Sequence, residues 1–124
     1  MNDALIQSAM RHHQAGQLAE AARLYSDVIR SNPSNFEALY GLGQIHLQSG
    51  RFGDTERLLA IAIRVRPQVP EAHYVHGCAF QNLQRHEDAL TCFARALSLR
   101  PDYLEARNNR GVCLLTLKRY AISS

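Results

Sequence analysis

The segment PEAHYVHGCAFQNLQRHEDALTCFARALSLRPDY, residues 70–103, carries the pattern that decides the fold. Its second proline, Pro101, follows Pro67 by 34 residues, and Pro67 follows Pro33 by the same interval. A fixed spacing of this kind indicates an internal repeat. With each proline placed at position 32, the units are residues 2–35, 36–69 and 70–103, followed by a partial unit at 104–124.

Equivalent positions of the units carry residues of the same kind. The residues at positions three, eight and 20 are small, and those at positions 24 and 27 are apolar. The partial unit is too short to include positions 24 and 27. They are Ala4, Ala38, Ala72 and Ala106; Ala9, Gly43, Gly77 and Gly111; Ala21, Thr55 and Ala89; Tyr25, Leu59 and Phe93; and Val28, Ala62 and Ala96. Small residues allow two helices to approach closely, and residues three apart share one helix face. The register therefore predicts pairs of antiparallel helices.

Short junctions separate the two halves of each unit. They are Gly16–Gln17, Gly50–Arg51, Gln84–Arg85 and Lys118–Arg119. Glycine is the usual residue at the end of a helix, so each half is predicted to be a helix of about 14 residues. One such pair cannot bury both apolar faces alone, and neighbouring pairs must stack. We expect an all-α solenoid.

The units also match a known signature, W-x2-L-G-x2-Y followed by A-x3-F and P. Unit two has Leu39, Leu42, Gly43, His46, Thr55, Leu59 and Pro67 at those places; unit three has His73, His76, Gly77, Phe80, Ala89, Phe93 and Pro101. The chain resembles tetratricopeptide repeat proteins over essentially its whole length. The resemblance implies a right-handed superhelical solenoid of about three and a half units and seven helices.

Some positions depart from that signature. Unit one has Ser8 and Ala9 in place of Leu-Gly, unit three has histidines at 73 and 76, and unit four has Arg107 and Arg110. These places are expected to be solvent-facing ends or softened packing.

By resemblance, the first helix of every unit lines a concave groove that binds an extended peptide or a helix. The groove residues so implied are Asp3, Ile6, Met10, Glu37, Tyr40, Gln44, Glu71, Tyr74, Cys78, Glu105, Asn108, Asn109 and Val112. The row of acids at position two has an alternative interpretation as helix-dipole stabilisation. Tyr40 and Tyr74 are the better binding candidates, with packing against a neighbouring helix as their alternative.

Chaperone-binding members of the family grip a C-terminal carboxylate with Lys, Asn, Asn, Lys and Arg. The corresponding places here hold Ile6, Met10, Gly41, Glu71 and Val75. An acid where the clamp needs a lysine repels the ligand, so we expect no binding to chaperone tails.

Composition narrows the function classes. The chain has 124 residues, 46% of them hydrophobic, with no apolar run of membrane-spanning length and no secretory signal, so a cytoplasmic location is expected. Three cysteines without CxxC spacing are interpreted as free thiols. The net charge of +3 is spread along the chain as single residues, and this pattern does not indicate nucleic-acid binding.

No enzyme, metal or cofactor is predicted. His73, His76 and Cys78 lack a fourth ligand, and the glycines of YGLGQIHLQSG fall inside a predicted helix.

The arginines of the second helices are expected on a solvated outer face, with a surface for anionic partners as the alternative. These are Arg23, Arg30, Arg51, Arg57, Arg64, Arg85 and Arg119.

Three functional readings follow. The first is a scaffold or adaptor that binds a peptide. The second is the substrate-holding arm of a larger enzyme, because residues 100–120 look like repeats of bacterial arrays that precede a catalytic domain, including relatives of O-linked N-acetylglucosamine transferases; Asn109 would then contact peptide backbone. The third is self-assembly through the last helix, whose Cys113, Leu114 and Leu117 lie on sides that a following helix would cover. A cap and a cut repeat array both fit the partial unit, and the cut array is favoured.

Overall fold

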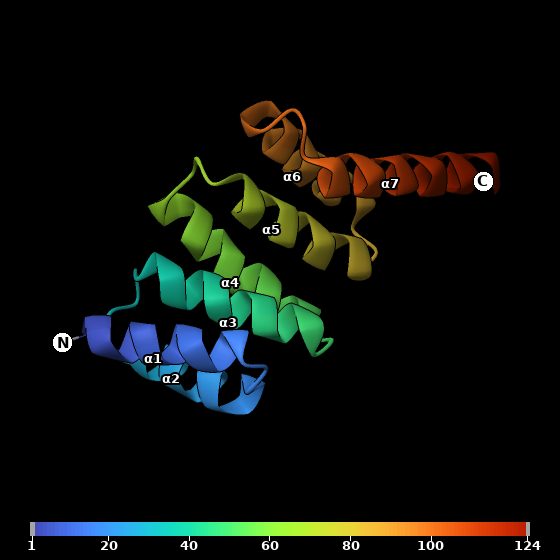
Figure 1. Cartoon of the computed structure of the whole chain (residues 1–124). Coiled ribbons are helices and arrows are strands. Elements are labelled where there is room, and N and C mark those ends of the chain that lie inside the picture. The colour runs from blue at the N-terminus through green and yellow to red at the C-terminus, as the bar shows by residue number, and fades with distance from the viewer. Residues whose placement is uncertain (1, 124) are drawn as a thin grey trace.

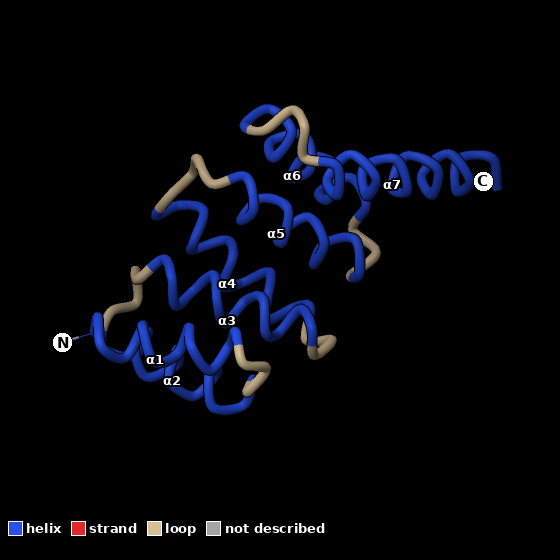
Figure 2. The backbone as a smooth tube through the Cα atoms, viewed as in Figure 1, coloured by secondary structure: helices blue, strands red, loops and turns tan. Residues whose placement is uncertain are grey.

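The structure is a computed structural model that describes the backbone of residues 2–123 and the side chains of residues 3–119. The described residues form seven α-helices (Figure 1). They are α1 (Asn2–Gln14), α2 (Leu18–Ser31), α3 (Phe36–Gln48), α4 (Phe52–Val65), α5 (Pro70–Asn82), α6 (His86–Leu99) and α7 (Leu104–Ser123). They stack as successive antiparallel pairs joined by short loops, which confirms the predicted helical repeat array (Figure 2).

The predicted junctions end their helices as expected, with one exception. Gly16 and Gly50 take left-handed φ values of 79° and 80°, and the amide of Arg51 donates to the His46 carbonyl at 2.8 Å. Gln84 takes φ 65° in the same motif without glycine. The turn expected at Lys118–Arg119 is wrong, because α7 continues to Ser123. Residue type alone does not set this junction, because Gln84 and Arg85 are comparable helix formers and the chain nevertheless turns between α5 and α6 there.

Close approach of helices explains the small residues of the repeat. A β-carbon on Gly77 would lie 2.6 Å from Cε1 of Phe93, the position-24 residue of the same unit. Ala38, Ala72 and Ala106 are fully buried at position three. Three connected hydrophobic clusters therefore run along the stack and make one continuous core.

The departures from the signature have specific contacts. His73 is buried, with its Nε2 2.8 Å from the Pro67 carbonyl oxygen. Arg107, 34 positions later, is exposed and donates to the Pro101 carbonyl at the same distance. His76 lies against Phe80 and places Nε2 3.3 Å from Glu56. Polar side chains are tolerated there because each has a hydrogen-bond partner.

Candidate peptide-binding groove

Helices α1, α3, α5 and α7 follow one another along one side of the stack, each in contact with the next of the series (Figure 1). A mostly apolar pocket of about 320 Å³ lies at the N-terminal half of this series. Its lining consists of Met10, His13, Gln14, Tyr25, Phe36, Glu37, Tyr40, Gly41, Gln44 and Arg66. The pocket therefore joins residues of the first two units.

Four predicted groove residues meet in this pocket, namely Met10, Glu37, Tyr40 and Gln44. The ring of Tyr40 stacks on that of Phe36, with centroids 5.6 Å apart and planes 12° from parallel. Gln44 Nε2 donates to the Tyr40 hydroxyl at 3.3 Å. Burial raises the pKa of Tyr40 to about 12, so its hydroxyl stays protonated near neutrality and remains a donor.

Tyr25 and His13 also line the pocket. Their rings meet edge to face at 5.8 Å, and His13 Nδ1 lies 3.1 Å from the Tyr25 hydroxyl. Burial lowers the pKa of His13, which favours its neutral form at pH 7. The absence of a side chain on Gly41 leaves room for the Tyr25 ring, whose Cε2 would lie 2.7 Å from a β-carbon there. This wall of the pocket is consequently uncharged.

Two of the four acids in the predicted row, Glu37 and Glu71, have arginine partners that the sequence did not indicate. Arg66 pairs with Glu37 at 3.2 Å, and its guanidinium lies 4.8 Å from the Phe36 ring centroid. In the next unit, Arg100 pairs with Glu71 at 2.8 Å and lies 3.9 Å from the Tyr103 ring. In each pair the two partners are 29 residues apart in the sequence. The two carboxylates are thus neutralised by the arginines that precede the repeat prolines.

The C-terminal half of the predicted groove is more closely packed. Tyr74 lies 5.9 Å from Phe93 and 5.1 Å from Tyr103, ring centre to ring centre, and burial raises its pKa. Asn109 donates to Gln81 Oε1 at 3.1 Å and points a second contact at Cys78 Sγ, 3.6 Å away. These side chains are engaged with neighbouring helices.

The remaining predicted residues differ in burial. Ile6 and Cys78 are buried in the core clusters. Asp3, Glu105, Asn108 and Val112 are exposed, and Glu71 is half-buried. Sequence reasoning missed His13, Tyr25, Phe36 and Arg66. The VRP and LRP triplets were the available signal for the two arginines, since both stand directly before a repeat proline.

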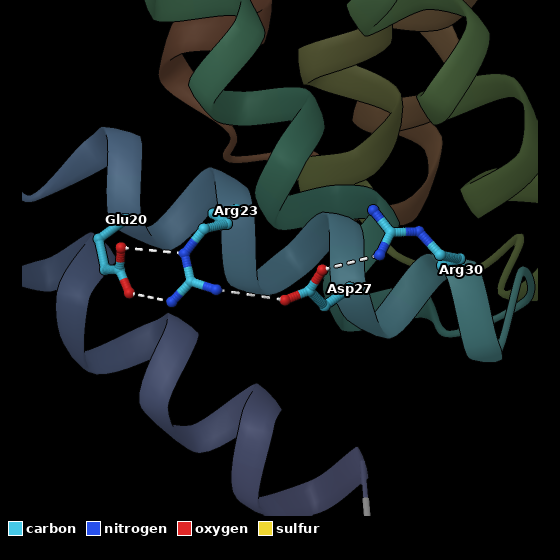
Figure 3. A network of polar contacts seen from close by, with 4 residues as sticks. All are labelled: Glu20, Arg23, Asp27 and Arg30. Atoms are coloured by element: carbon cyan, nitrogen blue, oxygen red, sulfur yellow. Dashed lines mark hydrogen bonds and ion pairs between the residues drawn. The ribbon is translucent and has the colours of Figure 1, made fainter.

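The outer arginines are largely paired within their own helices or turns. Figure 3 shows the chain of contacts on α2, in which Arg23 bridges Glu20 and Asp27, and Asp27 also accepts from Arg30 at 3.2 Å. Arg51 and Arg57 both pair with Asp54, and Arg85 pairs with Asp88. This arrangement weakens the interpretation of the outer face as an anion-binding surface.

Among the described residues, no three His, Cys, Asp or Glu side chains are grouped as a metal site. No described helix has the length and apolar character needed to cross a membrane.

Comparison with known proteins identifies the class of the chain. Two sequence profiles, each described as tetratricopeptide repeat, match residues 12–77 and 74–121. The chain belongs to the tetratricopeptide repeat family, whose domains are typically protein-interaction modules. No protein with a curated description matches by sequence.

Solved structures share the fold. The first repeat domain of Spaghetti (RPAP3), bound to the HSP90 peptide SRMEEVD, has a TM-score of 0.89 at 21% identity, with 94% of this chain and 93% of that chain covered. MamA from Desulfovibrio magneticus RS-1 has a TM-score of 0.89 at 19% identity, over 95% and 67% of the two chains. A Thermobaculum terrenum O-GlcNAc transferase mutant has a TM-score of 0.82 at 30% identity. The match covers 92% of this chain but only 23% of the transferase.

Proposed function

We propose that this protein is a scaffold that binds an extended peptide in the groove along α1, α3 and α5. The observation that carries the proposal is the apolar pocket between Met10, Tyr25 and Tyr40. Concave, mostly apolar recesses with a few polar groups at the edge are typical ligand sites. Tyr40 supplies a rigid aromatic surface, which is common at protein-binding hot spots.

The chemistry of the pocket favours an uncharged apolar side chain of the peptide. Its acid, Glu37, is paired with Arg66, and the pKa of His13 is lowered, so the pocket has little net charge near neutrality. The amides of Gln14 and Gln44 are among its lining groups, and they suit the polar groups of a peptide backbone. We therefore expect an apolar anchor residue flanked by main-chain contacts.

Chaperone tails are not the proposed ligand, although the RPAP3 structure contains an HSP90 peptide. Of the five clamp positions, Ile6, Gly41 and Val75 are buried, and Glu71 is bound by Arg100. None offers the cation or amide that a terminal carboxylate needs. We expect no measurable complex with SRMEEVD in calorimetry, and a tight complex would contradict the assignment of these positions.

The experiment that tests the groove is a selection from a random peptide library, followed by affinity measurements on three proteins. Met10→Glu places a charge in the pocket, while Leu5→Glu is the matched control on the same helix. Both parent side chains are similarly exposed, at 36% and 37%. Peptides lost by the first variant and retained by the second support the proposal. Equal binding to both variants places the working surface elsewhere.

The arm of a glycosyltransferase is a second candidate, favoured by 30% identity to the Thermobaculum terrenum enzyme. Against this candidate, the side-chain amide of Asn109 already donates a hydrogen bond to Gln81 and contacts Cys78. A peptide backbone would have to replace those contacts. Asn109→Ala should therefore leave peptide affinity unchanged under the first proposal and weaken it under the second.

A cytoplasmic location also remains part of the proposal. Cys78, Cys92 and Cys113 are all buried and unpaired, as suits thiols in a reducing compartment.

A further inference from the structure

The positive charge of the chain is concentrated on its last helix. α7 carries four basic residues and one acidic residue, which accounts for the whole formal charge of +3, because the preceding residues contain ten of each sign. The charged residues of α7 are Glu105, Arg107, Arg110, Lys118 and Arg119. Figure 1 shows the second half of α7 reaching beyond the other helices.

The same helix has large apolar side chains in solvent. Leu104, Val112, Leu114 and Leu115 are 59%, 53%, 52% and 66% exposed. The position equivalent to Leu114 in the third unit is Phe80, which is buried. A basic helix with an exposed apolar face is therefore present on the surface.

The repeat register shows what kind of element fits this face. Gly43 and Gly77 each lie against the position-24 side chain of their own unit, Leu59 and Phe93. Gly111 is their equivalent, and no described heavy atom lies within 4 Å of the place a β-carbon would occupy. The geometry calls for a second helix that brings a large apolar side chain onto Gly111.

A second copy of this chain is a poor occupant. Two α7 helices would repel each other, because each carries the same excess of positive charge. Several outer acids, namely Asp27, Asp54 and Asp88, already bind arginines of their own chain, and residues before α7 carry ten acids against ten basic residues. The chain therefore offers no surplus of acid to its own α7.

We propose that the uncovered face of α7 docks an acidic amphipathic helix of a partner protein, with a bulky apolar residue seated on Gly111. This surface is separate from the peptide groove. The apolar seat distinguishes it from a nucleic-acid site, in which backbone charge alone supplies most of the binding.

The probe is a capped peptide with the sequence of residues 86–99, the helix that covers Gly77 in this structure. A hydrocarbon staple joins its positions 91 and 95, opposite Phe93, and removes the only arginine, so Glu87 and Asp88 set its charge. Fluorescence anisotropy measures its affinity for the full chain and for Gly111→Leu. The matched protein control is Gly53→Leu on α4, where a β-carbon also has space. The matched peptide control is Phe93→Ala.

We expect Gly111→Leu and the Phe93→Ala peptide each to weaken binding by about tenfold or more, as for loss of an anchor residue. Gly53→Leu should leave the affinity unchanged. Arg107→Glu should weaken binding, and Arg64→Glu on α4 should not. The Met10→Glu variant of the groove should still bind the probe, so the two proposals fail independently.

Three results would overturn the proposal. The first is no binding of the stapled peptide, or binding that Gly111→Leu leaves intact. The second is a mass that doubles with concentration in light scattering without peptide, which would assign the face to a second copy. The third is displacement of the peptide by a single-stranded oligonucleotide that binds the parent and Gly111→Leu equally, which would make the face a charge-driven nucleic-acid site.

Discussion

Phe93 lies so close to Gly77 that a β-carbon on the glycine would come within 2.6 Å of the ring. The ring is fully buried and belongs to α6, while the glycine belongs to α5, so neither has room to move away without disturbing the pair. Closely packed helix pairs of this kind make the two glycines at 77 and 111 respond oppositely to the same substitution.

Gly77→Ala should destabilise the fold by about 1–3 kcal/mol, because the added methyl group overpacks the contact with Phe93. Gly111→Ala should stabilise it by about 1 kcal/mol, because alanine has the higher helix propensity and the site is open. Urea unfolding of both variants measures the difference. Equal losses of stability would show that the open side of α7 is covered in solution.

The pH dependence of stability should include a contribution from His76. Burial lowers its pKa from 6.5, against the opposing effect of Glu56, so the unfolded chain binds its proton more readily. Stability is therefore present above pH 6.5 and lost as the pH falls below it, until the folded-state pKa is reached. The slope per proton is at most about 1.4 kcal/mol per pH unit.

Denaturant unfolding between pH 7.5 and pH 5.5 measures this slope, and His76→Gln should reduce it. Burial also lowers the pKa values of His13 and His46, so these residues should account for the pH dependence that remains in the variant. A stability that increases on acidification would contradict the assignment.

Arg66→Gln should change the free energy of unfolding by less than about 1 kcal/mol, because the pair with Glu37 is 53% and 39% exposed. Its effect should fall on the groove. Without Arg66, Glu37 is uncompensated, and the pocket should gain affinity for lysine-containing peptides over uncharged ones, most clearly at low salt. Arg30→Gln, which removes a comparable pair on α2, is the control that should leave peptide preference unchanged.

The three thiols should be unreactive in the folded protein. Burial raises the pKa of Cys92 to about 12 and also raises the pKa values of Cys78 and Cys113. Since the thiolate is the reactive form, Ellman's reagent at pH 8 should give almost no colour until denaturant is added. Rapid development of colour in a native sample, with the modified cysteine identified by mass spectrometry as Cys113, would show that α7 detaches from α6.

The repeat could be predicted from the sequence because the residues that define it are local and recur at a fixed spacing. Pro67 and Pro101 set the register, and Gly43 and Gly77 mark where helices touch. Each feature acts within one unit, so spacing along the chain was enough to predict the helix pairs. The same reasoning failed at Lys118, where α7 continues to Ser123, because the residue types at a junction without glycine do not by themselves end a helix.

The candidate binding surface required the tertiary structure. Tyr40 and Tyr74 stand at the same position of their units, but Tyr40 lines a pocket while Tyr74 contacts Phe93 and Tyr103. Glu37 in the first turn of α3 and Arg66 directly after α4 meet across 29 residues, because the antiparallel packing of these two helices brings them together. The sequence alone determined the period, the helices and the faces they bury. Side-chain partners across helices depend on how the helices pack, so only the folded structure decided which of the predicted residues line a pocket.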